Sequence, residues 1–264
     1  MKTIVLLFIL ATTIATSHGL DLDHGKENKI VPRELKAFSS AHYERDIRCS
    51  SWRLGVETNN IIRFKTVPAK CKDYIRNYFL GDQSRADTKA VLSEAYSYAK
   101  SLDIIKGANY TWVFDIDETL LSNIEYYADR GFGTIPHNAT DFNKWIEKGK
   151  LPALPHSLKL YNKLLALDIK IAIITERPET QHKITVKNLW NVGYRKYAKI
   201  IFKDTKKEIY KGKTTLVYKL AERKKLEKEG FKIIGNIGDQ WSDILGTSTA
   251  VRSFKLPNPL FYVA

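Results

Sequence analysis

Four short apolar runs, each rich in β-branched or aromatic residues, alternate with stretches of helical periodicity along the chain. They lie at residues 110–114, 169–174, 199–202 and 231–234. Strands that alternate with helices form a parallel sheet, because each return to the next strand needs a crossover connection. The chain is therefore predicted to be an α/β protein built on a parallel sheet.

Helices are predicted between these runs and before the first of them. Apolar residues recur at helical spacing over 87–102 and 158–167. The helices after Pro178 and from about Thr214 each end at a glycine, as helices commonly do: Gly193 and Gly230. Residues 122–152 are too long for a crossover loop and rich in aromatic side chains. We interpret this segment as a small cap over the carboxyl ends of the strands, where open α/β sheets bind ligands.

The first 19 residues are predicted to be a cleaved signal peptide. A positive Lys2 precedes the apolar run 4–15, and small residues follow at the cleavage positions. The run is shorter than the roughly 20 residues of a membrane-spanning helix, so no membrane anchor is expected. Residues 20–47 are polar and irregular and are predicted to form an N-terminal arm, which leaves 48–264 as the folded domain. The protein is expected in the secretory pathway, either in the vacuole or outside the cell.

Cysteine and asparagine residues fit this compartment. The chain has two cysteines, Cys49 and Cys71, which are predicted to form a disulfide in an oxidising environment. Without a nearby histidine or third cysteine, they make an incomplete metal site. Asn109 and Asn138 begin sequons for N-glycosylation. Asn138 is the favoured acceptor, because Asn109 adjoins a predicted buried strand.

The balance of charge is strongly basic. Lys and Arg number 43 against 29 Asp and Glu, a formal net charge of +14. This balance favours acidic ligands or surfaces and leaves nucleic acid, phosphate esters and anionic membranes open. The basic residues of 203–232 lack the interleaved aromatic residues of single-strand binders, so we rank nucleic-acid binding last.

Paired carboxylates follow two of the predicted strands. Asp115 and Asp117 come directly after the run 110–114, so that one could address a substrate while the other acts as an acid or base. The alternative is a strand-ending turn that favours Asp. Asp239 and Asp243 follow another strand, behind Gly238, which would let the backbone turn sharply. Four converging carboxylates repel one another unless a cation lies among them, and oxygen ligands suit Mg²⁺.

An anion site is predicted at the end of a third strand. Thr175 ends the run 169–174 just before a helix, so a hydroxyl and the first amides of that helix point to one edge. Lys219 is favoured over Lys213 as the lysine that would neutralise a phosphoryl group, because Lys213 lies in a segment with an exposed pattern. Serine-hydrolase and P-loop motifs are absent from the sequence, which excludes those classes.

Segment 114–123 resembles the first motif of the haloacid dehalogenase (HAD) superfamily. More narrowly, the chain resembles plant acid phosphatases of HAD subfamily IIIB and their vegetative storage relatives. This narrower resemblance covers about residues 48–262 and rests on five blocks, at 49–53, 56–60, 67–71, 238–243 and 255–259.

The resemblance implies a Rossmann-like core with a small cap, and hydrolysis of a small phosphate monoester. Asp115 would attack the phosphoryl group and form an aspartyl-phosphate, while Asp117 would protonate the leaving oxygen and then activate water. Thr175 would bind the phosphoryl oxygens and Lys219 would neutralise them. Mg²⁺ would be held by the side chains of Asp115 and Asp239 and by the backbone carbonyl of Asp117, with Asp243 assisting.

Two positions depart from the family pattern. Glu176 stands where the superfamily often has a small residue, and it would repel substrate unless Arg177 pairs with it. Leu220 replaces the serine expected after Lys219. The alternative function is a vegetative storage protein with weak or incidental phosphatase activity, although the intact Asp115 favours an enzyme. Storage relatives are often dimeric, so a homodimer is left open.

Overall fold

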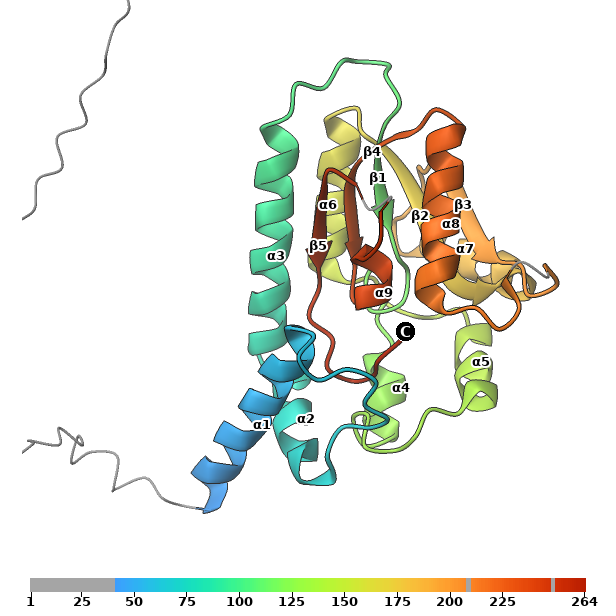
Figure 1. Ribbon diagram of the computed structural model, residues 1–264. Helices are drawn as coiled ribbons and strands as arrows, with labels where there is room; N and C mark the ends of the chain where they lie inside the picture. The colour runs from blue at the N-terminus through green and yellow to red at the C-terminus, as the bar shows by residue number, and fades with distance from the viewer. Residues whose placement is uncertain (1–40, 208–209, 248–249) are drawn as a thin grey trace, which may run out of the picture. The chain divides into compact units, whose positions relative to one another are not determined.

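A five-stranded parallel sheet lies at the centre of the described chain (Figure 1). The computed structural model describes residues 41–207, 210–247 and 250–264. The strand order is β3-β2-β1-β4-β5. The strands are β1 (Tyr110–Phe114), β2 (Lys170–Pro178), β3 (Lys199–Lys203), β4 (Lys232–Gly238) and β5 (Arg252–Lys255). The predicted α/β architecture with a parallel sheet is confirmed.

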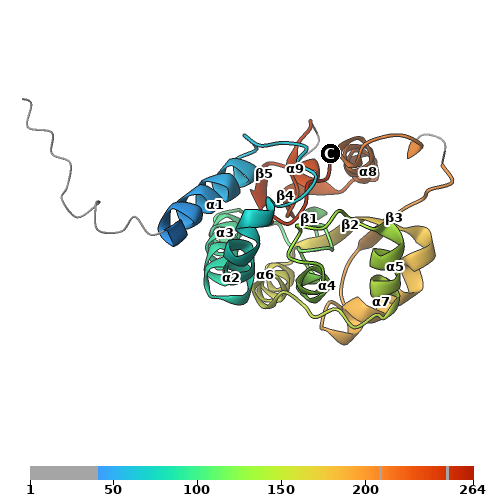
Figure 2. The same cartoon turned by 90° about the horizontal axis from the view of Figure 1, so that it is seen from below.

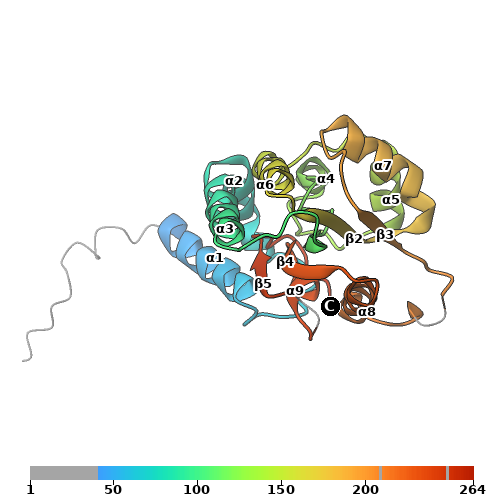
Figure 3. The ribbon, with the colours of Figure 1, turned by 90° about the horizontal axis from the view of Figure 1, so that it is seen from above.

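Helices cover both faces of the sheet (Figure 3). On one face lie α3 (Gln83–Lys100), α6 (Pro155–Ala166) and α7 (His182–Asn191), the last preceded by a 3₁₀ turn, Glu179–Gln181. On the other lie α8 (Thr215–Lys228) and α9 (Trp241–Ile244). Neighbouring strand residues alternate between these layers: Trp112 and Phe114 pack into the cluster with α3 and α6, and Val113 packs with α8. Because both faces are buried, the strands appear in the sequence as continuous apolar runs.

Most predicted elements are present with shifted ends. The helix expected over 87–102 is α3, and Gly193 and Gly230 follow α7 and α8 with φ of +109° and +88°. Strand β2 continues to Pro178, four residues beyond its predicted end. Strand β5 lies at the edge of the sheet and was not predicted, because Phe254 is the single apolar residue among its four.

The N-terminal helices and the predicted cap share a second apolar cluster. Residues 41–47 of the predicted arm lie in α1 (Ala41–Glu57), while the rest of the arm and the predicted signal peptide lie outside the described residues. A 3₁₀ turn, Ala69–Cys71, leads into α2 (Lys72–Leu80). The segment 122–152 contains α4 (Ile124–Asp129) and α5 (Ala139–Glu147), at the end toward which the strands run (Figures 1 and 2). Its residues Tyr126, Tyr127 and Phe132 pack with α2 and with Leu260.

The predicted disulfide joins Cys49 of α1 to Cys71. Both cysteines are buried in the second apolar cluster. Replacing both with alanine is expected to lower the free energy of unfolding by about 3 kcal/mol, because the unfolded chain then loses a cross-link that closes a loop of about 20 residues. Urea denaturation of the wild type and of the Cys49→Ala/Cys71→Ala variant measures this difference. An unchanged midpoint would show that the disulfide does not stabilise the fold.

Candidate active site

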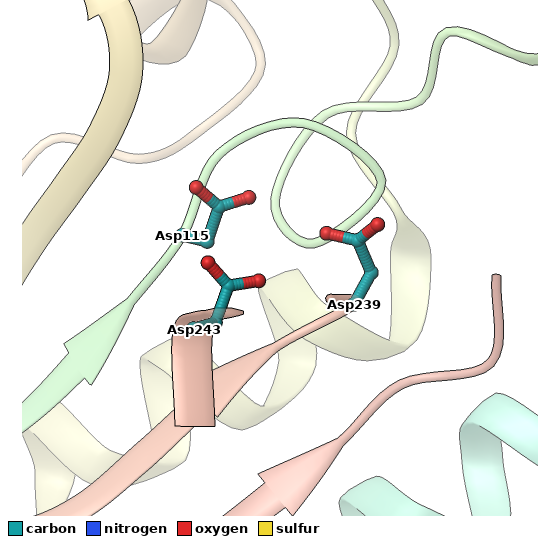
Figure 4. Close-up of side chains that lie close together, drawn as sticks. All are labelled: Asp115, Asp239 and Asp243. Carbon is teal, nitrogen blue, oxygen red and sulfur yellow. The ribbon is translucent and has the colours of Figure 1, made fainter. Parts of the chain in front are cut away.

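The predicted aspartate pairs meet at the carboxyl ends of β1 and β4. These strands are parallel neighbours, so the residues that follow them emerge at one edge of the sheet. The backbone N–H of Asp115 donates to the carbonyl of Ile237 (3.1 Å), which continues the strand pairing into the site. Carboxylate oxygens of Asp115, Asp239 and Asp243 lie within 4.8 Å of one another, and all three residues are buried (Figure 4). We call these residues the aspartate triad.

Asp243 reaches the triad from the short helix α9. Its Oδ2 accepts the backbone N–H of Gln240 (2.9 Å) and so caps the helix. Gly238 lies in extended strand rather than in a sharp turn, which corrects the sequence interpretation. A Cβ atom at Gly238 would collide with the side chain of Asp243. The glycine therefore provides space for the carboxylate of Asp243.

A buried lysine, Lys219 of α8, projects into the triad. Its Nζ donates to Oδ1 of Asp115 (2.5 Å) and to Oδ1 of Asp243. Burial alone would lower the pKa of Lys219, but the charges of Asp115 and Asp243 outweigh it and raise that pKa. Lys219 is therefore a charged ammonium group. Lys213, the other sequence candidate, is exposed.

The donor set of the triad fits a divalent cation. Three buried carboxylates face one lysine, which leaves an excess of negative charge. Burial, with the charge of Asp243, raises the pKa of Asp239 to about 6, and burial also raises the pKa of Asp115 well above its usual range. Within the described part of the chain, Oδ2 of Asp115 has no hydrogen-bond partner. A cation with oxygen ligands would replace the hydration that these buried carboxylates lose and would relieve the repulsion between them.

A tight turn after β1 separates the directions of Asp115 and Asp117. The backbone N–H groups of Leu120 and Leu121 both donate to the carbonyl of Ile116 (2.8 and 2.9 Å). Asp115 faces Lys219, and Asp117 faces Arg177.

Asp117 is held by a buried arginine. Nε and Nη2 of Arg177 donate to its two carboxylate oxygens (3.0 and 2.7 Å), and Nδ2 of Asn123 donates to Oδ1 (2.9 Å). Burial alone would raise the pKa of Asp117, but the charge and hydrogen bonds of Arg177 outweigh it and lower that pKa. Nη1 of Arg177 donates to Thr185, so the guanidinium group is itself fixed. The carboxylate of Asp117 is thus oriented beside the triad rather than within it.

The end of β2 supplies Thr175, Glu176 and Arg177. Thr175 is fully buried, and its hydroxyl accepts the backbone N–H of Arg177 (3.2 Å). Glu176 forms an ion pair with Lys203 of β3 (2.7 Å). Arg177 does not supply the pairing with Glu176 that the sequence analysis named as the condition for substrate binding, because it pairs with Asp117. Lys203 instead offsets the carboxylate that would repel a phosphate.

A cavity of about 330 Å³ opens beside the triad. Its polar lining includes Asp115, Asp117 and Lys219. The rest of the wall is largely aromatic and comes from the segment 122–152 and from the C-terminal residues: Tyr127, His137, Phe142, Phe261 and Tyr262. Thr175 is not part of this lining, although the adjacent Glu176 is. The cavity has room for a small substrate with an organic group.

Sequence reasoning missed the neutral side chains that hold Asp239. Its Oδ2 accepts from Nε2 of Gln240 (2.9 Å) and Nδ2 of Asn258 (2.6 Å), and its Oδ1 accepts from the hydroxyl of Thr119 (3.3 Å). All three residues lie in the segments that carry the family resemblance, which was the available signal. Amides and hydroxyls of this kind do not ionise, so a pattern of titratable residues does not indicate them.

Comparison with known proteins places the chain among phosphatases and storage proteins. The family model described as HAD superfamily, subfamily IIIB (acid phosphatase), matches residues 33–264. The chain is 39% identical to acid phosphatase 1 of Solanum lycopersicum over 264 residues, covering all of both chains. It is 46% identical to vegetative storage protein 1 of Arabidopsis thaliana over 217 residues, 81% of this chain and 78% of that one. The class C acid phosphatase of Bacillus anthracis has the same fold, with a TM-score of 0.51 at 22% identity over 72% of this chain and 86% of that chain.

Proposed function

Because this chain belongs to subfamily IIIB of the HAD superfamily, the acid phosphatases, we propose that it is a Mg²⁺-dependent phosphatase that uses Asp115 as its nucleophile. The substrate is a small phosphate monoester. The single observation that carries the proposal is the position of Asp115, which lines the cavity with one oxygen held by Lys219 and the other without a hydrogen-bond partner in the described chain.

In the first step, Oδ2 of Asp115 attacks phosphorus, and the bond from phosphorus to the leaving oxygen breaks. In the second step, water attacks the phosphorus of the aspartyl-phosphate and releases phosphate and the free carboxylate. Lys219 would stabilise the negative charge that develops on the phosphoryl oxygens. We propose the hydroxyl of Thr175 as a further phosphate-binding group; it does not line the cavity in this structure, but the adjacent Glu176 does.

Asp117 would donate a proton to the leaving oxygen and later take one from the attacking water. The ion pair with Arg177 orients both carboxylate oxygens, but it also lowers the pKa of Asp117, so it favours the base role in the second step and opposes the acid role in the first. General acid–base catalysis requires such fixed geometry, since the proton must transfer over a hydrogen-bond distance.

The residues proposed to hold Mg²⁺ are Asp115, Asp239 and the backbone carbonyl of Asp117, with Asp243 assisting. When bound, the ion would neutralise the aspartate triad and the phosphoryl oxygens. Thr119, Gln240 and Asn258 would keep Asp239 in place as a ligand.

The direct test of this function is hydrolysis of an aryl phosphate by the purified protein from acidic to neutral pH. We expect EDTA to remove the activity and added Mg²⁺ to restore it, because the triad would hold the ion required for turnover. Undiminished turnover in EDTA would contradict the metal requirement, and no turnover under any condition would contradict the phosphatase assignment.

Replacing Arg177 with methionine is expected to lower kcat for the aryl phosphate by about 10² -fold. The physical reason is that Asp117 then loses two of its three side-chain hydrogen bonds and its fixed orientation. Steady-state kinetics measures the effect, with Arg76→Met as the control because Arg76 is exposed. If both variants lose kcat to the same extent, or if neither loses any, Arg177 has no specific role in the chemical step.

A storage role is a second candidate, favoured by the 46% identity to vegetative storage protein 1. Amino-acid storage and phosphatase activity can coexist in one chain. The two accounts differ in the expected specific activity, since storage alone requires no turnover. Comparing kcat/KM with that of acid phosphatase 1 from Solanum lycopersicum, its full-length relative, would distinguish them.

We also propose that the protein travels through the secretory pathway to the vacuole or the cell exterior, with residues 1–19 as the signal peptide. Relatives named stem glycoproteins in Glycine max support this route. Asn138 is exposed at the start of α5 and is the preferred glycan acceptor, whereas Asn109 is half-buried and accepts a hydrogen bond from Lys170. No helix in the described ranges is both long enough and apolar enough to span a bilayer.

A further inference from the structure

A second polar cavity, of about 320 Å³, lies in the groove between α3 and α6. The two helices run side by side on one face of the sheet (Figures 1 and 3). None of the residues that line this cavity also lines the cavity at the aspartate triad. The buried side chains of Leu92 and Leu160 form part of its wall. The groove is therefore a separate feature that the proposed reaction does not use.

Both helices present basic or hydrogen-bonding residues to this groove. Lys89, Ser93 and Ser97 are four residues apart on α3, so they share one face of that helix. His156, Lys159 and Lys163 are three and four apart on α6 and likewise share a face. One lysine from α3 and two from α6 thus line the same cavity, together with side chains that can donate hydrogen bonds.

The positive charge of the groove is not neutralised by the protein. Nζ of Lys163 lies 3.8 Å from the centre of the Tyr96 ring. The lining residues Lys89, Lys159 and Lys163 have no ion-pair partner in the described part of the chain, and no described carboxylate lines the cavity. Ammonium groups gathered without a carboxylate attract an anion.

The neighbouring lysines also affect the pKa of His156. Burial lowers the pKa of His156, and the charges of Lys89 and Lys159 lower it further. A neutral imidazole can still donate one hydrogen bond, as can the hydroxyls of Ser93 and Ser97. Lysines and neutral donors together provide the groups that recognise a phosphate-type oxyanion.

We propose that the groove between α3 and α6 binds a small, multiply charged phosphate-type anion, either inorganic or carried by a phosphorylated metabolite. The cavity is large enough for a pyrophosphate or a sugar phosphate. Its lysines come from both helices, so a bound anion would bridge α3 and α6. The competing explanation is that these lysines form an ordinary solvated helix surface.

The test measures binding of inorganic pyrophosphate, and separately of glucose 6-phosphate, by titration calorimetry in EDTA at low salt. The protein carries Asp115→Asn so that neither probe is hydrolysed. In this background, Lys89→Gln/Lys159→Gln is compared with Lys224→Gln/Lys228→Gln. The control removes the same charge from two exposed lysines of α8, away from the groove.

We expect Lys89→Gln/Lys159→Gln to abolish binding of one equivalent of the probe or to raise its Kd about tenfold. The control pair should leave both the stoichiometry and the Kd unchanged. The probe that shows the larger loss identifies the inorganic or the organic source of the anion. Equal binding by both double variants would overturn the proposal, and so would an equal loss in both, since that would reflect net charge alone. In the Asp115-intact protein the groove variant should hydrolyse aryl phosphate at the wild-type rate, so failure of this proposal is distinct from failure of the proposed function.

Discussion

Replacing Asp115 with asparagine is expected to reduce kcat/KM for an aryl phosphate by about 10⁴-fold or more. Asparagine has nearly the same shape, so the cavity is retained, but its amide is a poor nucleophile and cannot form the acyl phosphate. The same change also removes one of the negative charges of the aspartate triad, which we propose to hold Mg²⁺. Both effects act on the chemical step rather than on substrate access.

The matched control for this variant is Asp103→Asn, because Asp103 is exposed in the loop before β1. Steady-state kinetics of both variants and the wild type gives the comparison. Activity of Asp115→Asn within tenfold of the control would mean that a different group attacks the phosphoryl centre.

Replacing Lys219 with methionine is expected to lower the free energy of unfolding in EDTA by about 3–5 kcal/mol. The variant leaves Asp115 and Asp243 buried without the ammonium group that now joins them. We also expect kcat to fall by about 10²–10³-fold, because charge on the phosphoryl oxygens would be less well stabilised. Urea unfolding and steady-state kinetics measure the two effects.

Added Mg²⁺ should recover part of the stability lost by Lys219→Met, because a cation that binds only the folded state stabilises it. Lys224→Met is the control, since Lys224 is an exposed residue of the same helix. A Lys219→Met protein as stable as this control in EDTA would show that the buried ion pairs do not hold the site together.

The sheet could be predicted because its inner strands are buried on both faces. Trp112 and Val113 pack into different layers, yet both are apolar, so the strand appears as one apolar run. Helix α1 could not be predicted in the same way. Residues 41–47 carry little apolar periodicity, and the helix is fixed to the fold through Cys49, a contact with a residue 22 positions along the chain. Such tertiary contacts override local sequence preference.

The triad could be predicted because carboxyl ends of adjacent parallel strands share an edge, so Asp115 and Asp239 had to emerge together. The pairing of Arg177 with Asp117 could not be predicted from the sequence, because it depends on where β2 ends. Since β2 continues through Glu176 and Arg177, these neighbours point to opposite faces of the sheet and cannot pair. Arg177 therefore reaches Asp117, and Glu176 reaches Lys203.

During turnover, a phosphoryl group is expected to pass through Asp115. The most direct measurement is acid quenching of the wild type during turnover of an aryl phosphate with Mg²⁺, followed by peptide mapping by mass spectrometry. We predict one phosphoryl group on the peptide that contains Asp115, and none on that peptide from Asp115→Asn. A phosphoryl group on another residue, or rapid turnover with no labelled peptide, would contradict the account.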